Sequence, residues 1–194
     1  MSKVVIQGDA SGTGIFTVKS PNSNTDRTLT LPDEAGTVLT SASTTVLPKG
    51  VPAFSVYTSA DQSFSQSTYT KVTFDTEQFD TNSNFASSRF TPTVAGYYLF
   101  NASIFISYLT SAPNTIRTIL YKNGSAYRSG YLASAGGASS GPYGALQVSD
   151  IVYLNGSTDY VEVYVWSNGV GAYVQDSNDS IITTFFSGML VRAD

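Results

Sequence analysis

Oxygen-bearing side chains gather near the C-terminus, in the stretch Asp176-Ser177-Asn178-Asp179. Ca²⁺ takes about six to eight oxygen ligands, and loops of Asp and Asn are a usual source of them. Asp176, Asn178 and Asp179 could therefore hold a calcium ion. The simpler interpretation, which we prefer, is a polar turn without a ligand, because short polar residues are common turn formers.

The sequence offers few groups for acid–base or nucleophilic catalysis. It has no histidine and no cysteine, which excludes the usual nucleophile–base triads and the usual zinc sites. Its glutamates are Glu34, Glu77 and Glu162. Glu162 falls on a predicted strand, where we expect a solvated or paired carboxylate and not a catalytic acid. We therefore expect a protein that is not an enzyme and that has no cofactor.

Four tyrosines fall in or beside predicted loops, namely Tyr127, Tyr131, Tyr143 and Tyr173. Exposed aromatic rings can stack on the faces of sugars, and their hydroxyl groups can form hydrogen bonds. These four residues are therefore candidates for a loop that faces a ligand. The alternative is that they pack in the core or between subunits, and this is the interpretation that we favour.

Charge is scarce in the sequence. Charged residues make up 12% of the 194 residues and aromatic residues 13%, against about 25% charged residues in an average globular domain. Such a composition is typical of secreted, extracellular or virion-surface β proteins. The net charge is −4, and the lysines and arginines form no cluster. Nucleic-acid binding is therefore not expected, because phosphate recognition needs clustered positive charge.

The sequence also bears on where the chain is made. With no cysteine it cannot be stabilised by disulfides, so it must rely on burial or on oligomerisation. The N-terminus lacks the apolar core of a signal peptide. No apolar run approaches the roughly 20 residues that span a bilayer, so membrane insertion is not expected. We expect assembly in the cytoplasm without an export signal.

The elements that position these groups are best seen around the predicted strand Tyr97–Ser107. Its side chains alternate, and one face is almost entirely apolar, as expected for a strand with one face in a core. Pro92 and Gly96 precede it and predict a turn, because proline lacks an amide hydrogen and glycine lets the backbone turn freely. The inward residues would be Tyr98, Phe100, Ala102, Ile104 and Ile106.

Further short strands are expected on both sides of this one. Asn123-Gly124 and Asn155-Gly156 each predict a hairpin, because Asn-Gly favours the tight turn between antiparallel strands. No segment has helical periodicity. The pattern predicts an all-β antiparallel sandwich of about eight to ten strands. The further strands are expected at residues 52–59, 68–79, 115–122, 125–133, 144–154, 159–167, 172–175 and 181–192, with loops at 80–88 and 134–142.

The N-terminal residues 1–47 differ from the rest. Their few large apolar side chains are spread among Gly, Ser, Thr, Asn and Asp, in short predicted strands at 4–7, 14–19, 27–31 and 37–40. So short a segment can hardly bury a core alone, so it should share one with other copies or with a partner. We expect two parts, a β-rich connector at 1–47 and a head domain at 48–194.

Two motifs in the head resemble those of a known fold family. Phe90, Gly96, Tyr98 and Phe100, spaced as Phe-(five residues)-Gly-x-Tyr-x-Phe, resemble the signature of the C1q/tumour-necrosis-factor-like jelly roll. Residues 186–191, Phe-Ser-Gly-Met-Leu-Val, resemble its last strand. The resemblance covers about residues 51–193 and implies a homotrimer with aromatic side chains packed along a threefold axis. The candidate core and trimer aromatics are Tyr97, Tyr98, Phe100, Phe185 and Phe186.

The connector resembles a different protein class. Residues 8–12, Gly-Asp-Ala-Ser-Gly, and residues 28–40, Thr-Leu-Thr-Leu-Pro-Asp-Glu-Ala-Gly-Thr-Val-Leu-Thr, are similar to the connector repeats of bacteriophage tail-fibre proteins. This resemblance implies attachment to other virion proteins through residues 1–47. The apolar side chains that would anchor it are Leu29, Leu31, Val38 and Leu39.

Together the two resemblances imply a trimeric structural protein of a phage virion, with a jelly-roll head that contacts a glycan or protein on the host surface. An alternative is a capsid decoration or head-fibre protein that stabilises the shell. A calcium-dependent glycan-binding module is a further alternative. A glycosidase or depolymerase is disfavoured, because the sequence has so few glutamates.

Overall fold

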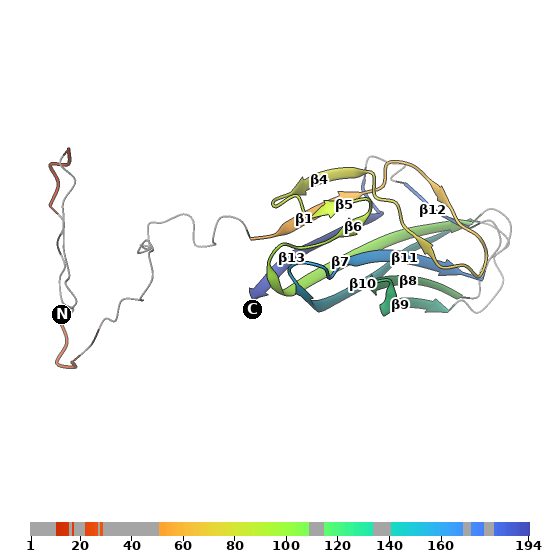
Figure 1. Cartoon of the computed structure of the whole chain (residues 1–194). Helices are drawn as coiled ribbons and strands as arrows, with labels where there is room; N and C mark the ends of the chain where they lie inside the picture. The colour runs from red at the N-terminus through yellow and green to blue at the C-terminus, as the bar shows by residue number, and fades with distance from the viewer. Residues whose placement is uncertain are drawn as a thin grey trace. The chain divides into compact units, whose positions relative to one another are not determined.

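The structure of the chain is a computed structural model (Figure 1). Two compact units, residues 1–42 and 43–194, make up the chain. We call the described part of the second unit, from Val51 to Asp194, the head. None of the described residues forms a helix, so none of them belongs to a helix that could cross a membrane. The structure describes residues 11–15, 17, 22–26, 28, 51–108, 115–133, 141–168, 172–176 and 181–194.

The first unit is described only at residues 11–15, 17, 22–26 and 28, and none of these lies in a strand. Ile15 is 94% exposed, so its apolar side chain has no core within the described part of the chain. The strands predicted at 4–7 and 37–40 lie outside the described residues. The same holds for the predicted anchoring residues Leu29, Leu31, Val38 and Leu39.

The head consists of antiparallel strands in two sheets (Figure 1). In the first sheet β7 is the central strand, with β10 on one side and β13 and β12 on the other. In the second sheet β11 lies between β8 and the short strands β3 and β6. The strands are β1 Ala53–Tyr57, β2 Gln62–Ser63, β3 Thr70–Lys71, β4 Thr76–Asp80, β5 Phe85–Ala86, β6 Arg89–Phe90, β7 Ala95–Tyr108, β8 Thr115–Lys122, β9 Ser125–Ala133, β10 Gly141–Asn155, β11 Val161–Ser167, β12 Ala172–Val174 and β13 Phe185–Ala193.

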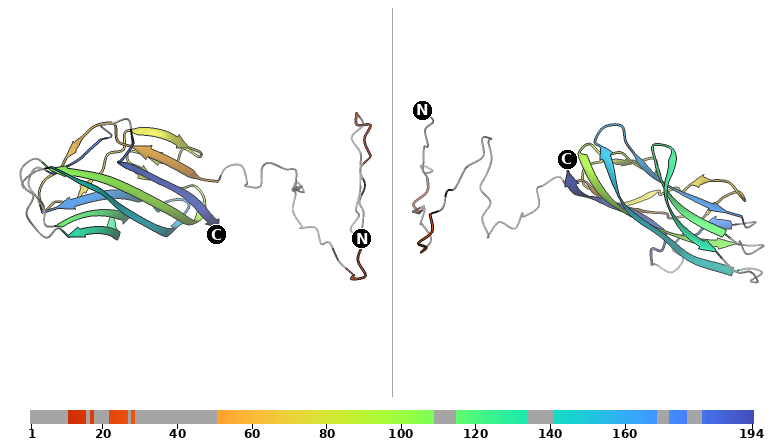
Figure 2. Two further views of the ribbon diagram at one scale, coloured as in Figure 1. Left: turned by 180° about the vertical axis from the view of Figure 1, so that it is seen from behind. Right: turned by 90° about the horizontal axis from the view of Figure 1, so that it is seen from below.

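The order of strands is β2-β12-β7-β13-β1-β4 in the first sheet, with β10 paired to β7. The second sheet has the order β5-β6-β11-β8-β9, with β3 paired to β11. Figure 2 shows the two sheets as separate layers, with β7, β10 and β13 side by side in one of them. All strand pairs are antiparallel, as the sequence predicts.

The core fills the space between the sheets and is rich in aromatic rings. Phe54 stacks on Phe90 with 4.5 Å between ring centroids, and Phe186 meets Phe54 edge-on at 4.9 Å. Each buried ring of this size contributes about 1.5–3 kcal/mol through removal from water. Tyr98 is fully buried, and its hydroxyl donates a hydrogen bond to the Val94 carbonyl at 2.7 Å, which satisfies the polar end of this side chain.

The predicted alternation of β7 is confirmed. The five residues expected to point inward are all at most 2% exposed. The predicted role of Gly96 in a turn is wrong, because Gly96 lies within β7. A Cβ atom there would clash with the backbone carbonyl of Arg192 in β13. Glycine is therefore required by the close approach of a neighbouring strand, next to a bulge between Leu190 and Arg192.

Two other predictions need correction. Residues 68–79 form no single strand: β3 pairs in the second sheet and β4 in the first, and the chain crosses between the sheets over residues 72–75. Val72 and Phe74 are buried at this crossing. The hairpin predicted at Asn155-Gly156 is also wrong, because the two strands on either side of it do not pair with each other. β10 pairs with β7, and β11 pairs with β8. That turn also carries the chain from one sheet to the other.

Candidate subunit interface

The outward face of the first sheet is apolar at one end. Leu99 of β7 lies opposite Ile151 of β10 on one side and Met189 of β13 on the other. Ile151 is 51% and Met189 46% exposed. We call Leu99, Ile151 and Met189 the apolar row. Beside it, the ring centres of Tyr97 and Tyr153 lie 5.4 Å apart. Contiguous exposed apolar side chains of this kind mark an interaction surface.

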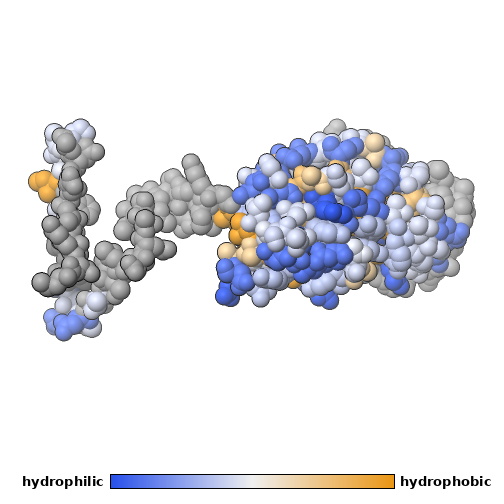
Figure 3. Space-filling model, in the orientation of Figure 1, coloured by the Kyte–Doolittle hydropathy of each residue, from blue (hydrophilic) through white to orange (hydrophobic). Residues whose placement is uncertain are grey.

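The apolar end continues across the sheet to β1 and β4. A hollow of about 240 Å³ lies there and is lined by Ala53, Phe79, Leu99 and Met189, among others. Phe79 is about half exposed. The hollow could receive an apolar side chain from another molecule. By comparison, the side of the head visible in Figure 3 is mostly hydrophilic, with small apolar areas.

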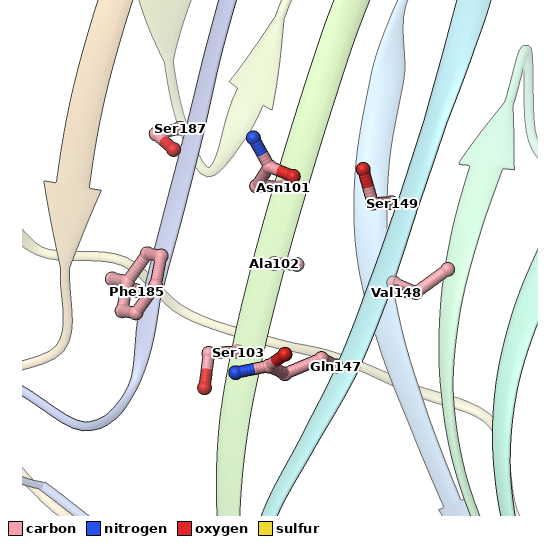
Figure 4. Close-up of a pocket in the computed structure, with 8 residues that line it drawn as sticks. All are labelled: Asn101, Ala102, Ser103, Gln147, Val148, Ser149, Phe185 and Ser187. Atoms are coloured by element: carbon pink, nitrogen blue, oxygen red, sulfur yellow. The ribbon is translucent and has the colours of Figure 1, made fainter.

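A polar band follows further along the same face (Figure 4). Asn101 of β7 lies opposite Ser149 of β10 and Ser187 of β13. Gln147 lies in the next row of this band, and the hollow between the strands measures about 290 Å³. None of these four side chains has a hydrogen-bond partner among the described residues. They are therefore available to bond with water or with a second molecule.

The tyrosine at the apolar end is fixed by a polar contact. The Tyr153 hydroxyl donates a hydrogen bond to the Asp194 carboxylate at 3.0 Å. This hydrogen bond, together with burial and the negative charge of Asp194, raises the pKa of Tyr153. The phenol is protonated at neutral pH, so Asp194 and not Tyr153 carries the negative charge at this end of the face.

Comparisons with known proteins bear on this fold. No family model matches the sequence, and no curated protein matches it. Murine APRIL is similar in structure, with 12% identity, a TM-score of 0.52, and coverage of 72% of this chain and 98% of that one. Eiger TNF from S. frugiperda has 13% identity and a TM-score of 0.53, and the match covers 74% of this chain and 93% of that one.

The head has a TNF-like jelly-roll fold. The predicted fold class is thereby confirmed, and the likeness at this level of identity concerns the fold alone. In the TNF-like head the predicted core and trimer aromatics lie in two places. Tyr98, Phe100 and Phe186 are fully buried between the sheets. Tyr97 is 44% exposed on the outward face, and Phe185 lines the hollow of the polar band.

The tyrosines expected in or beside loops lie in strands of the TNF-like head. Tyr127 and Tyr131 are in β9, Tyr143 is in β10 and Tyr173 is in β12. Tyr127 is exposed and Tyr173 is half-buried. The side chains of Tyr131 and Tyr143 lie outside what the structure describes. β10 begins three residues earlier than the sequence predicts and so includes Tyr143, because backbone pairing with β7 continues to Gly141.

The predicted calcium ligands are described only in part. Asp176 donates its backbone N–H to Asp61 Oδ1 at 2.9 Å, so two acidic residues from distant parts of the sequence lie close together. Asn178 and Asp179 lie outside the described residues. Among the residues that the structure describes, no group of three or more acidic side chains could hold a metal ion.

No motif in the sequence singles out Leu99, Ile151 and Met189. The alternation of side chains along a strand does indicate that Gln147, Ser149 and Ile151 share one face of β10, because they occupy every second position. It does not show which strand lies beside which. The apolar row exists only because β10 and β13 flank β7, and this pairing joins residues far apart in the sequence.

Proposed function

We propose that this chain is a homotrimeric structural protein of a bacteriophage virion. Its head contacts the host surface, and residues 1–47 attach it to other virion proteins. The protein is not an enzyme. The absence of histidine and cysteine from the sequence supports this, as does the position of Glu162, whose carboxylate forms ion pairs with Lys71 and Arg89.

The observation that carries the trimer is the apolar row of Met189, Leu99 and Ile151. Burying such a row in an interface stabilises the assembly by a free energy of about 25 cal/mol per Å² of apolar surface removed from water. A second and third copy of the chain, packed around a threefold axis, would cover the row and place the polar band of Asn101 and Ser149 within the same contact. The resemblance to the C1q/TNF-like family implies the same assembly.

The virion setting is supported by the sequence of residues 28–40, which resembles the connector repeats of tail-fibre proteins. A connector at the N-terminus and a compact head at the C-terminus suit an appendage that projects from a particle. The low charge and the many hydroxyl and amide side chains of the head suit a surface exposed outside the cell.

Two measurements test the proposal. Light scattering on the purified full-length chain should give the mass of three copies, and a monomer mass would overturn the trimer. Excess purified protein should block adsorption of the phage to its host, and unimpeded adsorption would overturn host contact. Antibody labelling in electron micrographs then locates the protein on the tail or on the capsid. A position on the capsid, without any effect on adsorption, would favour a decoration protein instead.

A further inference from the structure

A cleft of about 480 Å³ lies beside the β5–β6 hairpin of the second sheet. Its lining includes two cations, Lys71 and Arg89, and the small polar residues Ser83, Asn84, Ser87 and Thr91. No carboxylate is among the described residues that line it. The lining of the cleft is therefore positive and rich in hydrogen-bonding groups.

The two cations share a single counter-ion. Lys71 Nζ lies 3.1 Å and Arg89 Nε 2.9 Å from the same oxygen, Oε1 of Glu162. The Glu162 side chain is only 3% exposed, whereas those of Lys71 and Arg89 are 34% and 42% exposed. A buried carboxylate needs one partner charge to offset its desolvation. The second cation is in excess and leaves a positive charge at the cleft.

Arg89 is held in a fixed orientation. Its guanidinium carbon lies 3.8 Å from the centre of the Tyr160 ring, a cation–π contact. Its Nε is bonded to Glu162, and its two terminal nitrogens donate to no described residue. A guanidinium fork held in this way can bind a carboxylate or a phosphate with two parallel hydrogen bonds.

The backbone around the cleft is strained. Ser83, Ser87 and Ser88 have φ angles of 54°, 51° and 56°, a region that residues other than glycine rarely occupy. Ser88 is held there by the Phe74 N–H, which donates to its Oγ at 2.9 Å. The Ser87 carbonyl accepts a hydrogen bond from Lys71 at 2.8 Å. Ser87 and Ser88 form the two-residue loop of the β5–β6 hairpin, a turn with positive φ at both positions. This turn places the Ser87 carbonyl and the Lys71 amine together at the cleft.

Asn84 adds an unused acceptor. It is 6% exposed, and its Oδ1 atom accepts no hydrogen bond from any described residue. Its Nδ2 donates to the Asn82 carbonyl at 3.2 Å, which fixes the orientation of the amide. A buried acceptor without a donor is unfavourable. A ligand that brings a hydroxyl group to Asn84 would satisfy it, whereas a ligand without a donor would not.

We propose that this cleft binds an acidic sugar. Arg89 and Lys71 hold the anionic group, a carboxylate or a phosphate, and Asn84 accepts a hydrogen bond from a neighbouring sugar hydroxyl. The inference rests on the proposed host contact, which it deepens by naming the chemistry that the head recognises. It places the sugar on the second sheet, away from the candidate subunit interface on the first.

The outward face of β11 extends the site. Beyond Glu162 it presents Tyr164, whose ring stacks on Tyr121 at 3.9 Å, and then Trp166. The centre of the Tyr69 ring lies 6.3 Å from the ring centres of both Tyr121 and Trp166, and Tyr69 is 49% exposed. Aromatic faces can stack on the apolar faces of neutral sugars. Further residues of an oligosaccharide can therefore follow this surface from the cleft.

The test is a ligand-detected NMR titration of the full-length protein with glucuronic acid, glucose 6-phosphate, glucose and inorganic phosphate. We expect one or both anionic sugars to bind at least about tenfold more tightly than glucose. The preferred one shows whether the anion is a carboxylate or a phosphate. If no anionic sugar binds, the proposal is wrong. If inorganic phosphate binds as tightly as the sugars, the role given to Asn84 is wrong.

Variants with opposite expected effects sharpen the test. Arg89→Gln should weaken binding at least about tenfold, and Arg89→Lys, which keeps the charge but loses the fork, should weaken it less. Glu162→Gln keeps the side-chain shape and removes the competing charge, so it should strengthen binding. The matched control is Arg128→Gln, since Arg128 is an exposed arginine paired with Asp150 on β9 and β10. Unchanged affinity in both Arg89→Gln and Glu162→Gln would overturn the proposal.

The same variants separate this inference from the proposed function. If wild-type protein binds the anionic sugar but does not block phage adsorption, the cleft stands and host contact through the head fails. If Arg89→Gln protein blocks adsorption as well as the wild type does, host contact stands and the cleft is not its site.

Discussion

Gly188 in β13 lies directly against the ring of Phe100 in β7. A Cβ atom at Gly188 would lie 2.7 Å from Cδ1 of Phe100 and 2.8 Å from Cε1 of Phe54. Real Cβ atoms do not approach other atoms so closely, so the two rings require glycine at this position. The glycine of the closing motif and the phenylalanine of the central strand therefore form a single packing unit.

We expect Gly188→Ala to destabilise the head by about 1–3 kcal/mol, the usual range for overpacking a filled core. Within a strand, alanine is normally more stable than glycine, so a loss of stability identifies the clash. Chemical denaturation measures the free energy of unfolding. The control is Ser187→Ala, one residue away and on the opposite face, which should change it little. Equal stability of the Gly188→Ala variant and the wild type would contradict the packing.

The apolar row should control assembly. We expect the double substitution Ile151→Lys and Met189→Lys to give a folded monomer, because six buried like charges would face one another in a trimer. Light scattering gives the mass, and circular dichroism checks the fold. Ile181→Lys, at an apolar residue that is 69% exposed outside the row, should leave the trimer intact. A trimeric double variant would place the interface elsewhere.

Stability should fall at alkaline pH through Tyr98. Burial raises the pKa of Tyr98 to about 12, whereas an unfolded tyrosine has a pKa of about 10. The folded state thus holds the phenol proton more tightly. This stabilisation is complete below about pH 10 and is lost as the pH rises through about 12. We expect the urea concentration at the unfolding midpoint of the wild type to decrease as the pH rises through this range.

Tyr98→Phe provides the comparison. It should lower stability by about 1 kcal/mol at neutral pH, through loss of the hydrogen bond to Val94. It should also show a smaller alkaline decline than the wild type, because the titrating group is gone. Parallel pH profiles for the two proteins would show that other groups cause the decline.

Acid should loosen the turn around Asp159. The Asn123 amide donates to the Asp159 carboxylate at 2.8 Å, and Lys122 forms an ion pair with it at 3.3 Å. The hydrogen bond from Asn123 and the charge of Lys122 lower the pKa of Asp159. The folded state thus favours the ionised carboxylate of Asp159. The stabilisation from this carboxylate is present above the unfolded pKa of about 3.9 and is lost as the pH falls below that value.

We expect Asp159→Asn to be less stable than the wild type at pH 6 and closer to it at low pH. Urea denaturation from about pH 6 to pH 2.5 measures the difference, since this range spans the ordinary pKa of an aspartate. A difference in stability that does not depend on pH would contradict an ionic role for Asp159.

The sequence predicts the parts of the fold that depend on local chemistry. β8 and β9 have the predicted bounds, because Asn123-Gly124 forces a tight turn between two strongly alternating segments. The same signal at Asn155-Gly156 fails, because a tight turn can also carry a chain between two sheets. Only the pairing of β10 with β7, set by the whole core, decides between the two outcomes.

The candidate sites depend even more on distant pairing. Lys71 and Glu162 meet because β3 pairs with β11, across a separation of 91 residues. The sequence predicts that Glu162 is a solvated or paired carboxylate on a strand, but it does not show which cations lie beside it. It also gives no sign of the strain at Ser87 and Ser88, since serine is an unusual choice for a turn with two positive φ angles.

The position of β1 has a mechanical consequence. The chain enters the head through this strand, which lies between β13 and β4 and not at a sheet edge. The Leu190 N–H donates to the Pro52 carbonyl at 2.9 Å, so the pairing begins at the first residues of the head. A pull on Val51 along β1 would load the hydrogen bonds on both sides in shear, and they would have to break together. A head tethered by this strand would therefore withstand drag forces that would peel away a strand at an edge.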